Sequence, residues 1–114
     1  MRHDAERLQD VFDAIDAIER YTSSGRARFD ADELVRVFCL HHIEIIGEAV
    51  SRLSQELRDR HPVAPWRNIV AMRNALVHGY FDVDWEAVWN VVERDLKPLR
   101  SAVEQIMRAE GWMP

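Results

Sequence analysis

Residues 65–84 of this 114-residue chain are PWRNIVAMRNALVHGYFDVD, and this stretch carries the signals for one helix, its end and the start of the next. Its spacing predicts a helix from about Pro65 to His78, because apolar side chains recur every three or four positions and proline suits the first turn of a helix. Those apolar side chains are Trp66, Ile69, Val70, Met72, Leu76 and Val77. Gly79 is expected to end this helix, and Asp84 can cap the next one from Trp85.

The chain before this stretch predicts two further helices. The first runs from about Asp4 to Tyr21 and ends in a turn at residues 22–25. The second is long, from Ala31 to about Arg60, with Asp30 or Asp32 as its cap. Its predicted apolar face consists of Leu34, Val37, Phe38, Ile45, Ala49, Leu53 and Leu57. Gly47 within it indicates a close packing contact, in the subunit or across a dimer.

The helix from Trp85 onward is expected to kink or divide near residues 95–97, because Pro98 interrupts its hydrogen bonding. No stretch has the alternating pattern of a strand. The sequence therefore predicts an all-α bundle of four to five helices in a single domain, residues 1–114.

Composition limits the function classes. The net charge of −5, from 20 acidic and 15 basic residues, argues against a protein that coats nucleic acid, but leaves room for an enzyme with one arginine-lined cleft. The single cysteine, Cys39, excludes an internal disulfide and a cysteine-rich zinc site, so a cytoplasmic location is expected. No apolar run reaches the roughly 18 residues of a membrane span.

Polar residues of chemical interest gather at the end of the helix over residues 65–78. Arg73 offers a planar fork for a phosphodiester, and His78 titrates near neutral pH. The guanidinium can stabilise a phosphorane while the imidazole moves a proton, so the pair predicts RNA cleavage without a metal or other cofactor. Asn74 could orient either group. The alternative interpretation is a helix-capping His78 beside a surface arginine, and spacing alone favours this alternative.

Other polar and aromatic residues also have two interpretations. Arg67 could contact RNA or pair with an acidic side chain. His41, Glu44 and Glu48 share a helical face, which suits either a metal or a hydrogen-bonded network, but no other helix supplies a matching Glu-x-x-His pattern. The tryptophans could stack on bases, although Trp66, Trp85 and Trp89 follow the core-facing pattern. Cys39 is interpreted as a small buried hydrophobe.

The same stretch resembles the signature of HepT-like proteins of the HEPN superfamily. Their motif, Arg, four residues, His, any residue, Tyr, matches without a gap at Arg73, His78 and Tyr80. Residues 43–49, and Trp89 with residues 95–96, are similar to the family's second and fourth helices, so the resemblance covers nearly the whole chain. His41-His42 departs from the family pattern, in which an Arg-Asn-like pair is commoner.

The resemblance implies a toxin of a toxin-antitoxin system that is an endoribonuclease and a homodimer, with two Arg73–His78 motifs facing each other in one composite site for RNA. It also implies a partner, a minimal nucleotidyltransferase antitoxin that adds AMP to the motif tyrosine, here Tyr80, and silences the enzyme. Negative phosphates beside His78 would occupy the place of RNA phosphate. The alternative function is a non-catalytic subunit that binds and regulates the nucleotidyltransferase.

Overall fold

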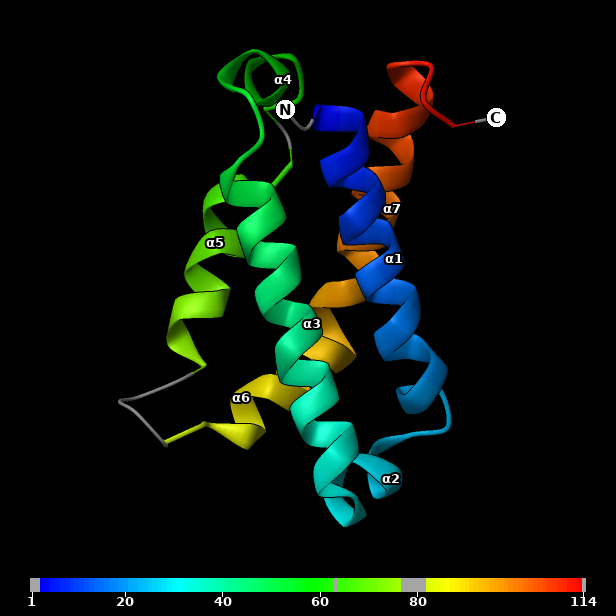
Figure 1. Ribbon diagram of the computed structural model, residues 1–114, viewed down its shortest axis with the longest axis vertical. Coiled ribbons are helices and arrows are strands. Elements are labelled where there is room, and N and C mark those ends of the chain that lie inside the picture. The colour runs from blue at the N-terminus through cyan, green and yellow to red at the C-terminus, as the bar shows by residue number, and fades with distance from the viewer. Residues whose placement is uncertain (1–2, 63, 77–81, 114) are drawn as a thin grey trace.

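A computed structural model describes residues 3–62, 64–76 and 82–113, and of Arg73 and Ala75 it describes the backbone only. Within these residues the chain forms seven α-helices and one π-helical segment (Figure 1). In chain order they are α1 (Asp4–Thr22), α2 (Arg26–Ala31), α3 (Glu33–Ser51), α4 (Gln55–Arg60), α5 (Trp66–Ala75), α6 (Trp85–Asn90), η1 (Val91–Asp95) and α7 (Leu96–Ala109). The predicted all-α class is confirmed.

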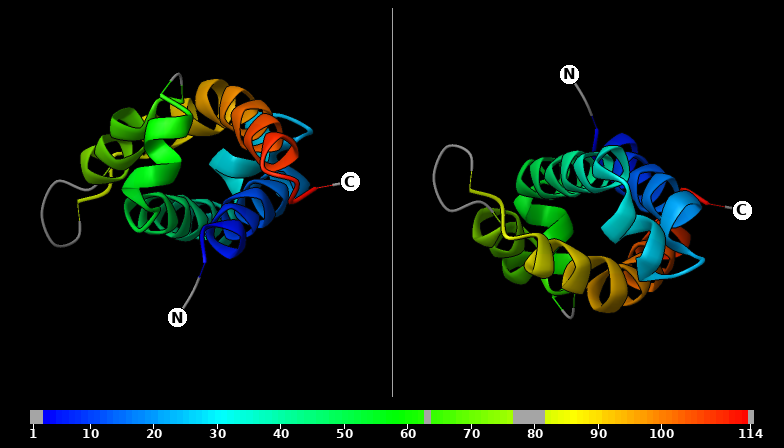
Figure 2. Two further views of the ribbon diagram at one scale, coloured as in Figure 1. Left: turned by 90° about the horizontal axis from the view of Figure 1, so that it is seen from above. Right: turned by 90° about the horizontal axis from the view of Figure 1, so that it is seen from below.

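The longer helices α1, α3, α5 and α7 surround the core. Packed pairs follow the order α5, α3, α1, α7, and the α6–η1 segment closes the ring between α5 and α7 (Figure 2). Each helix contributes apolar side chains to one continuous core, in which Ile15, Ile43 and Leu57 are fully buried. Burial of these side chains stabilises the bundle through the hydrophobic effect. No helix in the described part of the chain is long and apolar enough to cross a membrane.

The predicted long second helix is wrong, because the chain breaks it at residues 52–54. Asp32 caps α3 as expected, by accepting a hydrogen bond from the N–H of Leu34. Ser54 starts the separate helix α4, since its hydroxyl accepts from the N–H of Leu57. The Ser54 N–H in turn donates to the Asp4 carboxylate at 2.9 Å. A contact 50 residues away in sequence therefore stabilises the break.

The apolar face assigned to this region is partly wrong as well. Leu34 is 79% exposed and Val37 is 49% exposed. Residues on another side of α3 are buried instead, namely Val35, Cys39, Ile43, Ile46, Gly47 and Val50, together with Ala49 of the predicted face. Burial of Gly47 agrees with the expected packing contact. The sequence of α3 is apolar around most of its circumference, so periodicity did not identify the side that faces α1 and α5.

The helix after Trp85 divides close to the predicted place. The α6 helix gives way to the π-helical segment η1 directly before α7, whose third residue is Pro98. Proline has no N–H to donate to the carbonyl four residues earlier, that of Arg94, so regular α-helical bonding cannot continue through this turn. The expected division before Pro98 is therefore confirmed.

Side-chain contacts hold the two chain ends near α4. The α1 helix is joined to the start of α4 through Asp4 and Ser54. The end of α7 is joined to the end of α4 by Glu110, whose carboxylate accepts from Arg60 at 2.7 Å and from His61 at 2.9 Å. These contacts place α4 across one end of the bundle (Figure 1).

Candidate functional site

Helix α5 carries the described part of the predicted site. Arg67 and Asn74 are exposed, and their separation of seven residues places them on one face of the helix, two turns apart. Arg73 lies in the last turn of α5, and its side chain is outside the described residues. His78 and Tyr80 also lie outside them. The structure therefore brings Arg67 and Asn74 together on one surface and leaves their relation to His78 as a prediction.

Both ends of α5 are anchored in the bundle. At its start the indole N–H of Trp66 donates to the carbonyl of His61 at 3.0 Å, and the ring is buried. At its end Leu76 caps the helix and is only 1% exposed. A helix fixed at both ends gives the polar groups on its outer face a defined position, as a binding or catalytic surface requires.

The chain returns to the bundle at Asp84, directly beside the end of α5. The backbone N–H of Asp84 donates to the carbonyl of Leu76 at 2.8 Å. The Asp84 carboxylate accepts from the N–H of Ala87 at 3.0 Å, which confirms the predicted cap of α6. Leu76 and Asp84, the described residues on either side of the motif positions 78 and 80, are therefore in direct contact.

Helix α2 holds the start of α6. Arg26 donates to both carboxylate oxygens of Glu86, one at 2.8 Å, and its Nε lies 3.1 Å from Asp30. These hydrogen bonds raise the pKa of Arg26 and lower the pKa of Glu86. Trp85 packs edge-on against Phe29 of α2. Because the Arg26–Glu86 pair is exposed to solvent, it stabilises the contact between α2 and α6 only modestly. Burial of Phe29 against Trp85 contributes more to this contact.

The histidine and glutamate stripe of α3 shows no metal geometry. His41 and Glu44 are exposed, and Glu48 pairs with Arg52 at 2.6 Å. His42 packs against Phe38 and its Nδ1 lies 2.8 Å from the Phe38 carbonyl. Across the described residues, no group of three His, Cys, Asp or Glu side chains could hold a metal ion.

The tryptophans and the cysteine take the predicted structural roles. Trp66 and Trp89 are buried and Trp85 is partly buried against the core. Cys39 is completely buried, and burial raises the pKa of its thiol to about 11. A thiol with so high a pKa is a poor nucleophile at neutral pH.

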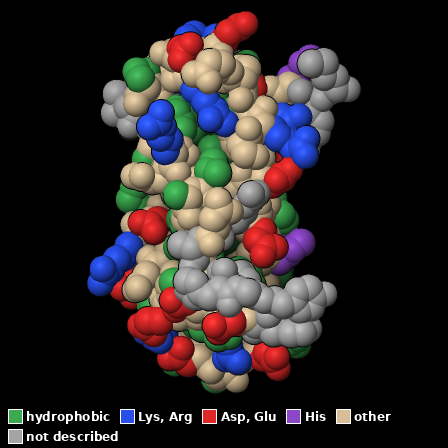
Figure 3. All heavy atoms as spheres, turned by 90° about the vertical axis from the view of Figure 1, so that its left-hand side faces the viewer, with side chains coloured by type: hydrophobic (Ala, Val, Ile, Leu, Met, Phe, Trp, Pro, Cys, Tyr) green, Lys and Arg blue, Asp and Glu red, His purple; other side chains and the backbone are tan. Residues whose placement is uncertain are grey.

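The surface that includes α5 is uneven in charge (Figure 3). Acidic side chains gather over its lower part, and lysine and arginine side chains are more frequent over its upper part. Asp82 and Glu86, which flank the return of the chain at Asp84, are both exposed. A negatively charged ligand would therefore meet the least repulsion along the upper part of this surface.

Sequence reasoning missed two features of this region. The Arg26–Glu86 pair joins residues 60 apart, and no local pattern could have identified it. Asn68 and Asp95 line a pocket between α5 and α7. One sequence signal could have identified Asn68 as a pocket residue. Pro65, Asn68 and Met72 recur on one side of the helix, so Asn68 is a polar residue that interrupts an apolar face.

Comparisons with known proteins define the class. The family model described as Ribonuclease HepT-like matches residues 11–106, which include the whole Arg73 to Tyr80 motif. The chain therefore belongs to the HepT-like ribonuclease family, and its helical bundle fits the HEPN superfamily.

Individual relatives agree with this assignment. The chain is 32% identical over 108 residues to the probable ribonuclease HepT of Thermococcus cleftensis, covering 94% of this chain and 98% of the relative. A candidate RNase of Caldanaerobacter subterraneus is 33% identical, with 82% and 83% covered. A candidate RNase of Methanocaldococcus jannaschii is 32% identical, with 85% and 90% covered. No solved structure shows a significant similarity to the chain.

Proposed function

We propose that this protein is a metal-independent endoribonuclease in which Arg73 and His78 are the catalytic residues. The observation that carries the proposal is the family match across residues 11–106, together with the ungapped motif inside it. The anchored helix α5 supports the assignment, because it gives Arg73 a fixed backbone position. The ribonuclease names of the relatives support the same substrate class.

In this mechanism the RNA supplies its own nucleophile. His78 takes the proton of a ribose 2'-hydroxyl, and the 2'-oxygen then forms a bond to the adjacent phosphorus. The bond from phosphorus to the 5'-oxygen breaks, and a protonated His78 imidazole gives its proton to that oxygen as it leaves. Arg73 stabilises the negative charge on the phosphorane oxygens. The products are a 2',3'-cyclic phosphate and a free 5'-hydroxyl.

Two residues of α5 support the catalytic pair. Asn74 follows Arg73 directly and is exposed, so its amide can orient the guanidinium or the phosphate. Arg67 lies two turns earlier on the same face as Asn74 and is also exposed. We assign Arg67 to a contact with the RNA backbone, because an exposed guanidinium on this face would attract phosphate.

We further propose that the active form is a homodimer in which the two motifs form one site. Two arginines and two histidines would offset the acidic charge of each chain at that place. A molar mass measured by light scattering at micromolar concentration should equal two chains. A monomer that retains full RNA cleavage would contradict the composite site.

The regulatory part of the proposal is a toxin-antitoxin pair. A nucleotidyltransferase antitoxin would transfer AMP from ATP to the Tyr80 hydroxyl and release pyrophosphate. The attached phosphate adds about one negative charge per phosphodiester two residues from His78. It would compete with RNA phosphate for Arg73, which explains inhibition without any change of fold.

The decisive experiment is cleavage of RNA by the purified protein in EDTA. Activity should persist, the product should end in a 2',3'-cyclic phosphate, and a 2'-deoxy substitution at the cleaved position should prevent cutting. His78→Ala and Arg73→Lys should each lose most of the activity, because the second variant keeps the charge but not the planar fork. Cleavage of the 2'-deoxy substrate would contradict the mechanism.

The second candidate function is a non-catalytic subunit that binds a nucleotidyltransferase. The acidic charge of −5 and the acidic lower part of the α5 surface favour a protein partner over RNA. This candidate predicts that His78→Ala leaves toxicity in growing cells unchanged. Loss of toxicity in that variant would favour the ribonuclease.

A further inference from the structure

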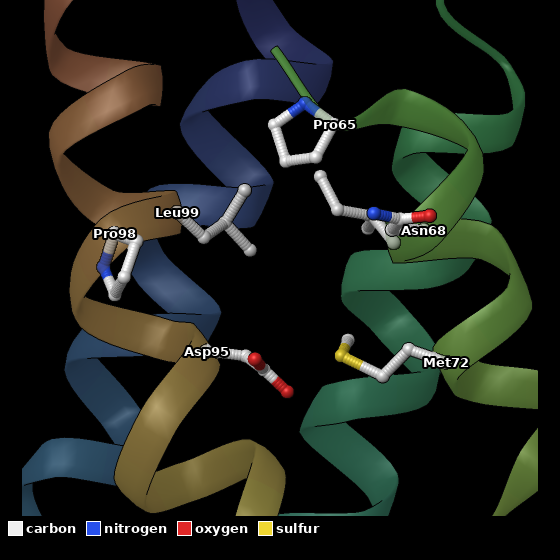
Figure 4. Close-up of a pocket in the computed structure, with 7 residues that line it drawn as sticks. Pro65, Asn68, Met72, Asp95, Pro98 and Leu99 are labelled. Atoms are coloured by element: carbon white, nitrogen blue, oxygen red, sulfur yellow. The ribbon is translucent and has the colours of Figure 1, made fainter.

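A pocket opens between α5 and the start of α7 (Figure 4). Two polar side chains line it, Asn68 of α5 and Asp95 of η1. Its apolar lining consists of Pro65, Ile69, Met72, Pro98 and Leu99. The volume is about 220 Å³. Since an apolar cavity of about 150 Å³ can hold benzene, this pocket has room for one flat heterocycle.

The pocket has a buried floor and an accessible rim. Ile69 and Leu99 are buried, whereas Asn68 and Asp95 are exposed at the edge. The floor therefore offers apolar contact to the face of a ring, and the rim offers hydrogen bonds to its edge. This combination, an apolar site with a few polar groups, is typical of sites for small ring systems.

The polar groups of the rim are available to a ligand. Among the described residues, neither Asn68 nor Asp95 has a hydrogen-bond or ion-pair partner for its side chain. The Asp95 carboxylate and the Met72 thioether point toward one another from opposite sides of the pocket (Figure 4). Because an ionised carboxylate only accepts hydrogen bonds and repels phosphate, this pocket selects a ligand edge with N–H donors.

We propose that the pocket binds one base of the RNA substrate and that Asp95 selects guanine; this inference rests on the proposed ribonuclease function. Guanine has two adjacent donors, N1–H and the 2-amino group, which match the two oxygens of one carboxylate. Uracil presents a single N–H between two carbonyl oxygens, and those oxygens would repel Asp95. Adenine and cytosine offer one amino group beside an acceptor nitrogen.

The position of the pocket on α5 supports this role. Met72 lines it, and Arg73 is the next residue, about 100° further around the helix. The base-binding face and the arginine assigned to phosphate are therefore neighbouring faces of one anchored helix. A single RNA strand could place a base in the pocket and the phosphate of an adjacent nucleotide at Arg73. Splayed bases of single strands are the usual target of sequence-specific RNA recognition.

Binding can be tested separately from cleavage. In the full chain with methyl-labelled methionine, guanosine should shift the Met72 methyl signal, which Met72→Leu identifies, and uridine should shift it much less. Asp95→Asn should abolish the guanosine shift. Asp59→Asn is the matched control, because it removes the same charge from an exposed position on α4, outside the pocket. In this variant guanosine should still shift the Met72 methyl signal. A Met72 signal that responds to protein concentration but not to guanosine would assign the pocket to contact between copies and overturn the proposal.

Cleavage of a random RNA pool tests the specificity. In RNAs cleaved by the wild-type protein or by Asp59→Asn, guanine should be enriched at one nucleotide position, a fixed distance from the cleaved bond. In RNAs cleaved by Asp95→Asn this enrichment should be lost. Inosine at this position, which lacks the 2-amino group, should lower kcat/KM by on the order of tenfold. If wild type and Asp95→Asn cleaved RNA with the same base preference, the proposed base site would be overturned and the proposed ribonuclease function would stand. Guanosine binding without cleavage of any RNA would support the base site and contradict the ribonuclease.

Discussion

The backbone N–H of Asp84 donates a 2.8 Å hydrogen bond to the carbonyl oxygen of Leu76. This bond joins the end of α5 to the residue that begins the return into α6, eight positions later in the chain. The Asp84 side chain fixes the conformation of its own backbone by capping α6. One residue therefore joins the end of α5 to the start of α6.

Asp84→Ala should weaken both stability and activity. Loss of the cap should lower the free energy of unfolding by about 1 kcal/mol. RNA cleavage should fall because the cap no longer fixes the backbone conformation that directs the Asp84 N–H, which the variant retains, at the carbonyl of Leu76. Urea denaturation and initial cleavage rates measure the two effects. Asp32→Ala is the matched control, because Asp32 caps α3 in the same way at a position outside the site. Equal losses of activity in the two variants would show that activity follows stability alone.

Tyr80→Phe should separate cleavage from its regulation. The variant keeps the aromatic ring but lacks the oxygen that accepts AMP, so it should cleave RNA and remain toxic when the antitoxin is co-expressed. Intact-mass measurement after incubation with the antitoxin and ATP should show AMP additions on the wild-type chain and none on the variant. Additions at another residue, or unchanged cleavage by the modified wild type, would contradict the assigned role of Tyr80.

Glu110 should contribute to stability in a pH-dependent way. Hydrogen bonds from Arg60 and His61 hold the pKa of Glu110 below its ordinary value of 4.5. Its stabilisation is therefore complete above about pH 4.5 and is lost as the pH falls through the lowered folded-state pKa. Glu110→Gln should lower the Tm at pH 7, and the difference from wild type should shrink as the pH falls below 4.5. Glu44→Gln, an exposed site in the middle of α3, should change the Tm much less at either pH.

Cys39 should be unreactive in the folded protein. Burial raises the pKa of its thiol from 9.0 to about 11, so little thiolate forms at pH 8. Burial also keeps an alkylating reagent away from the sulfur. Alkylation followed by mass spectrometry should be slow in buffer and fast in urea. Because the unfolded thiol ionises at a lower pH than the folded one, the free energy of unfolding should decline as the pH rises from about 9 to about 11. In Cys39→Ala this part of the decline should be missing. Equal alkylation rates in buffer and urea would contradict the burial.

Local signals predicted several parts of this fold correctly. The extent of α1, the caps at Asp32 and Asp84 and the division of the helix before Pro98 all follow from residues within one or two turns. Capping and proline effects act over that range, so a pattern in the sequence is sufficient to locate them. The motif at Arg73, His78 and Tyr80 was identified in the same way, as residue types at a fixed spacing.

Other parts depend on contacts between distant residues. The break at Ser54 depends on Asp4, and the start of α6 is held by the pairing of Arg26 with Glu86. The exposure of Leu34 depends on which side of α3 meets α1 and α5. The pocket at Asp95 exists only because residues of α5, η1 and α7, which are distant in the sequence, line one space. Local pattern alone thus determined the helical class, the caps and the motif, whereas tertiary packing decided the break, the buried face and the pocket, because these depend on which helices become neighbours.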